Sequence, residues 1–571
     1  MDTAMGMATD MVMKIKGSNY RPVSGAILAC LSTVAFSQSS ISGAPTTGGS
    51  TGFSTTSVVG ATSGAGTPPA KEAVDAGNQG REWVIKPRVT LTETLSDNVN
   101  VNRVKNGKQS DLITEIAPGI RVEAKTAKLK AYLDYTLRGQ FYAKEPDYNR
   151  SQNSLNTFGT LEAIDNWFFV DFSGFITQQT ISAFGAQSTS ASTINNNSTE
   201  TASYRISPYI HGQMGGLVDY LLRYNLSTTR SDASIVSDTN ISEWVGQLRG
   251  STPFQKLKWT IDTSQQSTDY SRGRDTDAER IRAMLTYSIL PQLRFSLSGG
   301  QERNNYASLN QETNSTHGYG FDWNPTERTQ ISGFKEHRFF GDGHNFSFSH
   351  RLPRSSIRIS DTRDVSVLPN QYTSTGLGTV YNLYYQIFSN IEPYASMDPA
   401  VKDAAVASAV NTMLAQNGVS PNTQVTSSFL SARATVQRRQ DLTLATFGAR
   451  NSITVVLNRT ESQSVLAAQA SNDDFSQTTM VKQQGGSVNF AHRLSEISNL
   501  NALVSRQESK GSNNVNGNSN LKTTTTTYLV NASTKLGAKT TGSLSARRTE
   551  FESTTNPYTE NALLGTISFI Y

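Results

Sequence analysis

The residues of this chain best suited to chemistry are charged side chains that recur at alternate positions, on one face of several extended segments. Basic and acidic residues are interspersed on this face, which is predicted to line a water-filled lumen with Lys130, Asp134, Arg138, Asp171, Arg205, Asp219, Arg223, Asp262, Arg294, Arg358, Arg493 and Arg547. A ring of one charge sign would select ions of the opposite sign. A mixed set indicates either a hydrated wall stabilised by ion pairs or a passage that favours anionic or sugar substrates. Tyr132, Tyr142 and Tyr209 are candidate platforms for stacking sugars.

No other motif predicts catalysis or metal binding. Residues 48–52 match the G-x-S-x-G pattern, but that nucleophile turn needs a strand before it and a helix after it, and neither is predicted. His317, His337, His344 and His350 contain no HExxH and no i,i+4 pair. The only cysteine is Cys30, which falls in a predicted targeting segment. We therefore predict no catalytic residue, no metal ligand, no cofactor and no enzymatic activity.

The composition favours a transmembrane β-barrel as the scaffold for these side chains. Of the 571 residues, 17% are charged and 36% are hydrophobic, while aromatic residues still reach 9%. The mean hydropathy is −0.42. Only every second residue of a barrel strand faces lipid, so a low mean hydropathy is expected. The net charge of +5 is spread without a basic block, which argues against nucleic acid as a partner.

Period-2 alternation dominates from Trp83 onward and is clearest in residues 129–142. A soluble β-sandwich would alternate too, so the lengths of the connections must discriminate. Short connections such as 165–166 and 253–255 alternate with long polar ones such as 181–200 and 463–480. Outer-membrane barrels combine short periplasmic turns with longer extracellular loops. The sequence therefore predicts a single large antiparallel barrel of about 22 strands, with both termini in the periplasm.

Both ends of the chain carry export features. Residues 1–37 read as a signal peptide with a basic start and a short apolar run, although Ile27–Cys30 also loosely resembles a lipidation site. Residues 38–80 are a flexible linker rich in Ser, Thr, Gly and Pro, and the barrel is predicted over 81–571. The C-terminal residues of one face resemble the signal that barrels present to the barrel-assembly machinery: Leu563, Gly565, Ile567, Phe569 and Tyr571.

One segment, 367–439, is too long for a hairpin loop. Asp398 and Pro399 predict a helix start and Asn417-Gly418 its end, so this insert is a candidate plug or lid. Alternatively, 375–386 and 427–438 are also strands, which raises the strand count to 24.

Several stretches together resemble the outer-membrane β-barrels associated with PEP-CTERM/exosortase systems and exopolysaccharide loci. They include Trp83–Pro87, Thr114–Ile120, Gly318–Thr329, His337–Gly341 and Gly448–Asn451, in that order. The resemblance covers about 83–571 and implies a barrel linked to exopolysaccharide or surface-protein export. It carries over no catalytic residue.

The functional hypothesis is a non-enzymatic outer-membrane pore or export conduit. The alternatives are a scaffold barrel that anchors partners, and the sheath barrel of an electron-export conduit. The expected partners are outer-membrane lipid and lipopolysaccharide, the assembly machinery, and polysaccharide or export-system components.

Overall fold

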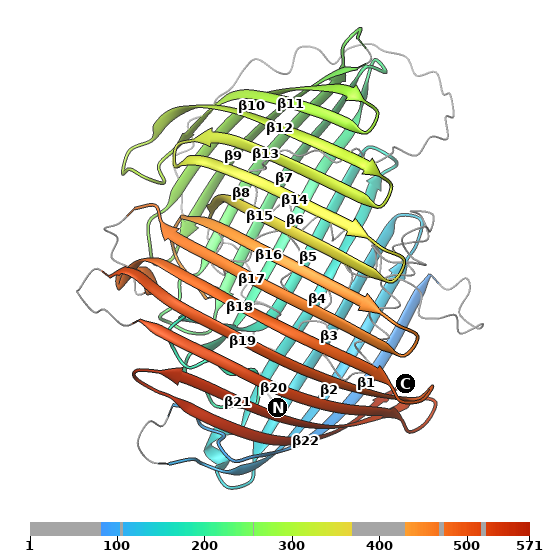
Figure 1. Cartoon of the computed structure of the whole chain (residues 1–571), viewed down its shortest axis with the longest axis vertical. Helices are drawn as coiled ribbons and strands as arrows, with labels where there is room; N and C mark the ends of the chain where they lie inside the picture. Colours follow the sequence, from blue (N-terminus) through green and yellow to red (C-terminus); the bar gives the residue numbers. More distant parts are fainter. Residues whose placement is uncertain (1–81, 103–106, 255, 368–428, 467–472, 515–520) are drawn as a thin grey trace. The chain divides into compact units, whose positions relative to one another are not determined.

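The computed structural model describes residues 82–102, 107–254, 256–367, 429–466, 473–514 and 521–571. These residues form one antiparallel sheet in which each strand pairs with its neighbours in sequence and β22 pairs with β1, which closes a barrel (Figure 1). The predicted fold and the count of 22 strands are confirmed.

The strands run in sequence order around the wall. They are β1 Trp83–Ser96, β2 Asp111–Lys125, β3 Leu129–Tyr142, β4 Arg150–Ile164, β5 Phe168–Thr180, β6 Ser198–Met214, β7 Val218–Ser231, β8 Thr239–Ser251, β9 Leu257–Tyr270, β10 Thr276–Leu290, β11 Leu293–Asn304, β12 Glu312–Thr326, β13 Thr329–Arg338, β14 Gly341–Arg351, β15 Ser355–Ser366, β16 Thr435–Phe447, β17 Asn451–Ser464, β18 Thr478–Arg493, β19 Ser498–Asn514, β20 Lys522–Lys535, β21 Thr540–Ser553 and β22 Tyr558–Ile570. Two short 3-10 turns, η2 Pro146–Tyr148 and η4 Asp474–Ser476, lie in connections.

Alternation within each strand separates an inward from an outward face. In β3 the inward Asp134 and Gln140 are 7% and 0% exposed, whereas the outward Leu137 and Phe141 are 38% and 50% exposed. Successive side chains of a strand point to opposite faces of a sheet, so a polar–apolar alternation assigns each residue to one side of the wall. The outward positions form an apolar surface of the kind that outer-membrane barrels present to lipid. Among the described residues, none forms a helix of the length and hydropathy that crossing a membrane requires.

Most connections follow the predicted alternation of short and long, although 271–275 is as short as 252–256 and 554–557 is as short as 536–539. Turns such as 126–128, 215–217 and 291–292 join strands at one end of the barrel, and longer loops such as 181–197 join them at the other. The barrel segment begins with β1 and ends with β22 at the short-turn end. The predicted exception is also present, because only two residues separate β13 from β14. Gly341 begins β14 with a φ of 91°, which a glycine adopts without steric cost.

Some details of the prediction need correction, and others fall on residues that the structure does not describe. The insert predicted over 367–439 is too long at its C-terminal boundary, because residues 435–439 belong to β16 and pair with β15. The direct pairing of β15 with β16 also excludes the 24-strand alternative. The predicted helix from Asp398 to Asn417, the segment 375–386, the leader 1–37 and the linker 38–80 lie outside the described residues.

Candidate functional site: a charged inner wall beneath a packed loop

All twelve residues predicted to line the lumen lie at inward positions of their strands, as the strand registers and burial patterns show. They fall into two groups that differ in their surroundings. Lys130, Asp219 and Arg493 are exposed close to the short turns, whereas the others are less exposed, and most of those form ion pairs. Arg138, Arg205 and Arg358 are half-buried.

Ion pairs across neighbouring strands neutralise most of the deeper charges. Asp134 accepts from Arg88 at 2.5 Å and from Arg121 at 3.1 Å. The carboxylate of Asp171 lies 2.9 Å from Arg223. These pairs join strands β1, β2 and β3 in one case and β5 and β7 in the other, so they stabilise the wall as well as setting its charge.

Three more of the predicted residues follow the same pattern. Asp262 lies 2.7 Å from Arg282, and Arg547 lies 2.9 Å from Glu560. Arg294 is 3.9 Å from Asp322, a looser contact. The mixed charge that the sequence suggests therefore exists in the structure largely as ion pairs.

Sequence reasoning missed the most deeply buried charge network, which spans β10 to β15. Arg338 donates to Glu302 at 2.7 Å and to Asp364 at 2.5 Å, and Arg280 pairs with Glu336. The arginines and glutamates of this network are 0–7% exposed. The inward register of β10, β11 and β13 could have revealed them, had the alternation been followed along these strands.

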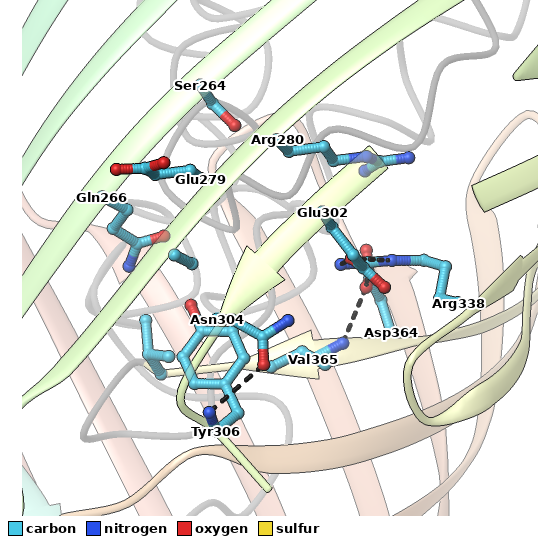
Figure 2. A pocket seen from close by; sticks show the side chains of 12 residues that line it. Ser264, Gln266, Glu279, Arg280, Glu302, Asn304, Tyr306, Arg338, Asp364 and Val365 are labelled. Carbon is cyan, nitrogen blue, oxygen red and sulfur yellow. Dashed lines mark hydrogen bonds and ion pairs between the residues drawn. The ribbon is translucent and has the colours of Figure 1, made fainter. Parts of the chain in front are cut away.

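A small cavity adjoins this network. It measures about 20 Å³, which is room for about one water molecule. Figure 2 shows Glu302, Arg338 and Asp364 converging at its edge, with Tyr306 and Asn304 on another side. A space of this size suits an ordered water rather than a substrate.

The three predicted stacking tyrosines have different fates. Tyr142 is buried and donates to the backbone oxygen of Ser192 at 2.6 Å, so it holds a loop. Tyr132 is 4% exposed and stacks on Phe158 at a centroid distance of 5.2 Å. Only Tyr209 of the three is partly exposed.

Tyr209 belongs to an inward aromatic group near the short-turn end. Its ring stacks on Phe169 at 5.2 Å, and His211 stacks on Phe169 at 4.8 Å. The guanidinium of Arg223 lies 4.1 Å from the centre of the Tyr209 ring, within cation–π range. This group combines a flat apolar face with charged neighbours, and we call it the aromatic platform.

At the opposite end of the barrel, residues 181–197 between β5 and β6 fold into the mouth; we call them the constriction loop. Ile194 forms a parallel bridge with Asn100, in the connection after β1. Arg150 donates to the backbone oxygens of Ala191 at 2.7 Å and Thr193 at 3.1 Å. These bonds tie one side of the loop to β1–β4.

The other side of the constriction loop reaches strands far around the wall. Ala183 accepts from the Thr523 hydroxyl of β20 at 3.1 Å, and Gln187 accepts from Tyr558 of β22. Asp474 of η4 accepts from the Ser182 hydroxyl at 2.5 Å and from the Ala183 amide at 2.7 Å. In a 22-strand ring, the connection that contains η4 lies on the far side from β5 and β6, so the loop bridges the mouth.

Apolar clusters fix these contacts. Ala183 packs with Phe429, Phe475 and Val481, which come from three other parts of the chain. A second cluster joins Ala186 of the loop to Val101, Phe551 and Tyr558. The loop is therefore held by a small core inside the barrel mouth, as well as by hydrogen bonds.

The position of Asp474 in this core changes its acidity. Burial raises the pKa of the Asp474 carboxyl to about 6, against the opposing effect of the hydrogen bonds from Ser182 and Ala183. The neighbouring Asp473 adds to the increase. The contact between the loop and η4 is therefore sensitive to pH in the mildly acidic range.

The burial of inward side chains differs between the two ends of the lumen. Many inward side chains next to the long loops are buried; Ser96, Asp111, Thr199, Thr239 and Thr549 are at most 5% exposed. Several inward side chains next to the short turns are exposed, among them Lys130, His211, Asp219, Lys258 and Arg493. The barrel thus has an open charged vestibule at one end and a packed mouth at the other.

The predicted assembly residues share the outward face of the closing strand. Leu563, Ile567, Phe569 and Tyr571 are 40–67% exposed, and a Cβ on Gly565 would meet open space. The Tyr571 amide donates to the Pro87 oxygen of β1 at 2.9 Å. Their role in assembly stays a prediction.

The four clustered histidines do not converge on a common point. All lie at outward positions: His317 stacks on His337, His344 pairs with Asp361, and His350 contacts Thr329. Within the described ranges, no group of three or more His, Cys, Asp or Glu side chains is arranged to hold a metal ion.

No protein-family model and no curated protein matches the chain. Among solved structures it is similar to the siderophore receptor PirA of Pseudomonas aeruginosa (8% identity, 85% of this chain and 80% of that one, TM-score 0.40). It is also similar to the FrpB iron transporter of Neisseria meningitidis (10%, 86% and 81%, TM-score 0.45) and to OccK2 (OpdF) of P. aeruginosa (6%, 85% and 98%, TM-score 0.32). At these identities and TM-scores, the matches say nothing about what this chain binds or transports.

Proposed function

We propose that this protein is an outer-membrane channel that passes its cargo along a hydrated, mixed-charge wall and is narrowed at one mouth by the constriction loop. The observation that carries this proposal is the difference between the two ends of the lumen. The short-turn end is an open charged vestibule, and at the long-loop end a loop packs across the mouth. A wall lined by ion pairs attracts water, and barrels of 22 strands are wide enough to need such a plug.

The same architecture supports one orientation of the barrel in the membrane. Short turns face the periplasm and long loops face outward in bacterial outer-membrane barrels. The packed mouth is then extracellular and the vestibule periplasmic, so cargo arriving from the periplasm meets the charged wall before the constriction.

Single-channel conductance in planar bilayers tests the channel. The informative variant replaces residues 184–195 with a short Gly-Ser linker, which removes the loop from the mouth. The matched control replaces residues 307–310 of the β11–β12 loop, where Leu309 is 77% exposed. We expect several-fold higher conductance from the first variant and no change from the second. If neither the native chain nor the loop-deleted variant conducts, the channel proposal fails.

The cargo we propose is exopolysaccharide or an exported surface protein, and the aromatic platform favours the polysaccharide. Flat aromatic faces pack against the apolar faces of sugar rings, and the platform lies at the vestibule end of the wall. Arg223 beside Tyr209 is paired with Asp171 at 2.9 Å, so an acidic sugar unit would compete with that carboxylate for the cation.

Oligosaccharide blockade of the channel current tests the cargo. Tyr209→Ala should shorten the blockade by acidic oligosaccharides several-fold while the open-channel conductance stays unchanged. Tyr224→Ala, on the outward face of β7 against Trp244, is the matched control. Equal dwell times in the native chain and in Tyr209→Ala would exclude the platform as a sugar site.

A sealed barrel that anchors partners is the second candidate. The apolar clusters that hold the constriction loop favour it, because they close the mouth without any added ligand. Absence of conductance in both forms above would support this function.

A further inference from the structure

The outward face of the barrel is divided by charge. Across the described strands, the outward positions of β13–β21 carry nine Lys or Arg and six Asp or Glu, a net charge of +3. The outward positions of β22 and β1–β12 carry two basic and five acidic residues, a net charge of −3. The nine basic residues, which we call the cation arc, are Lys335, Arg363, Arg438, Arg459, Lys482, Arg506, Lys510, Lys522 and Arg548.

A groove of about 690 Å³ opens on this same outward face, over β14–β19. The strand registers align its outward side chains in two rows. The row nearer the short turns contains Ile359, Leu442, Leu457 and Gly486, and ends at Arg506. The row nearer the long loops contains Asp361, Gln440, Arg459, Gln484 and Glu508. The groove is therefore apolar toward the membrane core and polar toward the long-loop end.

Gly486 helps to keep the groove open. A Cβ at this position would lie 2.7 Å from Leu457 Cδ2, closer than side chains pack. Gly486 lies between Leu457 and Arg506 in the register. Because it has no side chain, a hollow remains between the Leu457 side chain and the Arg506 guanidinium.

The acidic groups around the groove are already engaged by protein donors. Asp361 accepts from Arg438 at 2.6 Å, from His344 at 2.9 Å and from Gln440 at 2.9 Å. Glu508 pairs with Lys522 at 3.0 Å. Glu461 lies between Arg459 at 2.6 Å and Lys482 at 3.6 Å, so it is shared by two cations.

Two cations of the arc remain for a ligand. Arg506 and Lys510 are both exposed, lie on the outward face of β19, and have no ion pair with another described residue. Lys510 is paired in register with Lys482. The ion pair of Lys482 is a loose one, 3.6 Å from the Glu461 carboxylate that Arg459 also contacts. Arg506 lines the groove, and Lys510 and Lys482 lie just beyond its long-loop end, past Glu508, so an anionic headgroup at this end meets three cations that protein carboxylates leave wholly or partly unneutralised.

We propose that this groove binds a phosphorylated, acylated lipid of the outer leaflet, with the chemistry of lipid A. Clustered Lys and Arg at a membrane interface attract anionic lipid headgroups. Arg506, Lys510 and Lys482 hold the phosphate, while an acyl chain lies along Leu442, Leu457 and the hollow at Gly486. This site rests on the proposed outer-membrane location, but it does not require that the barrel conducts.

Native mass spectrometry of the full chain, purified in detergent and mixed with lipid A, tests the proposal. We expect the native chain to retain lipid A, and dephosphorylated lipid A and phosphatidylcholine to bind at least tenfold more weakly. Inorganic phosphate alone should compete poorly, because it lacks the acyl chain that fills the groove.

Two variants separate the headgroup from the acyl contact. Arg506→Gln with Lys510→Gln removes two cations and should weaken lipid A retention at least tenfold. Gly486→Leu fills the hollow without changing the charge and should also weaken lipid A retention at least tenfold. Arg230→Gln with Arg303→Gln, at outward positions outside the arc, is the matched control. Circular dichroism confirms that each variant is a folded barrel.

Several results would overturn the proposal. One is unchanged retention in the Arg506/Lys510 variant, and another is an equal loss in the control pair. A third is equal binding of dephosphorylated lipid A. A doubled mass of the native chain that the Gly486→Leu variant abolishes would assign the groove to a second copy of this chain instead. Conductance is measured separately, so a silent barrel that still binds lipid A refutes the channel and not the site.

Discussion

At the scale of single residues, Arg338 shows how this barrel places charge inside its wall. Its guanidinium is 3% exposed and contacts carboxylates from β11 and β15. Taking such a group out of water is costly, and the cost is offset only when its partners are present. The sequence motif that contains Arg338 indicates only that the side chain points inward, whereas the two partners lie 36 and 26 residues away.

Removing Arg338 should therefore destabilise the barrel strongly. Arg338→Met leaves Glu302 and Asp364 without their main partner, and we expect a loss of about 3–5 kcal/mol in the free energy of unfolding. Arg230→Met, which breaks an exposed pair with Asp238, should cost less than about 1 kcal/mol. Urea unfolding in lipid vesicles measures both. A loss below 1 kcal/mol for Arg338→Met would contradict a structural role for the network.

Asp474 makes the attachment of the constriction loop depend on pH. Its folded pKa of about 6 lies above the ordinary 3.8, so between these values the folded state binds more protons than the opened state. The attachment of the constriction loop is then strongest below about pH 4, weakens as the pH rises through 6, and stays constant above that. From pH 7 to pH 5 the opening constant of the loop should fall roughly tenfold, because its attachment strengthens.

Hydrogen exchange of the Ala183 amide, corrected for the intrinsic rate at each pH, measures this effect. Asp474→Asn is the control, since an amide does not titrate in this range. A slope of opposite sign in the native chain, or the same slope in the Asn variant, would show that another group controls the loop.

At the scale of elements, β7 shows why alternation determines function. Leu221 faces inward opposite His211, and the adjacent Leu222 faces outward at 44% exposure. The same residue type thus meets water on one side of the wall and, in the proposed membrane, lipid on the other. Periodicity of this kind is local, which is why the sequence predicts the faces of the strands correctly.

The two leucines allow a matched test. Leu222→Arg should cost about 2–4 kcal/mol because it places a cation against lipid near the middle of the apolar face. Leu221→Arg should cost much less, because the vestibule is open to water and Asp219 and Gln247 lie nearby. Folding yield and urea midpoints in vesicles distinguish them. Equal costs would mean that the outward face of β7 does not contact lipid.

At the scale of the whole molecule, closure determines which end of the barrel each connection occupies. Twenty-two is an even number, so β1 starts and β22 ends at the short-turn end. The proposed orientation then places the ends of the barrel segment in the periplasm and the constriction loop outside.

Labelling of single cysteines tests this orientation, because the sequence has no cysteine other than Cys30. Arg272→Cys lies in the five-residue connection after β9, at the long-loop end of the barrel, and Glu327→Cys lies in the short turn after β12; both positions are exposed. A membrane-impermeant maleimide should label the first in intact cells and the second only after the outer membrane is permeabilised. The reverse labelling pattern would show that the barrel has the opposite orientation in the membrane.

The sequence by itself determined the inward and outward faces of the strands and the alternation of short and long connections, and it narrowed the strand count to 22 or 24. These features follow from local periodicity and from the turn signals between strands, and each is complete within some 30 residues. The inward position of all twelve predicted charged residues is a consequence of that periodicity.

Only the tertiary structure decided which charges pair and how the mouth is filled. The bond between Ser182 and Asp474 joins residues 292 positions apart, and the contact between Tyr558 and Gln187 joins residues 371 apart. No periodic pattern records such contacts, because they form only once the wall has closed and the loop between β5 and β6 has turned inward. The buried arginine network and the outward groove arise in the same way, from side chains that the closed barrel brings into register.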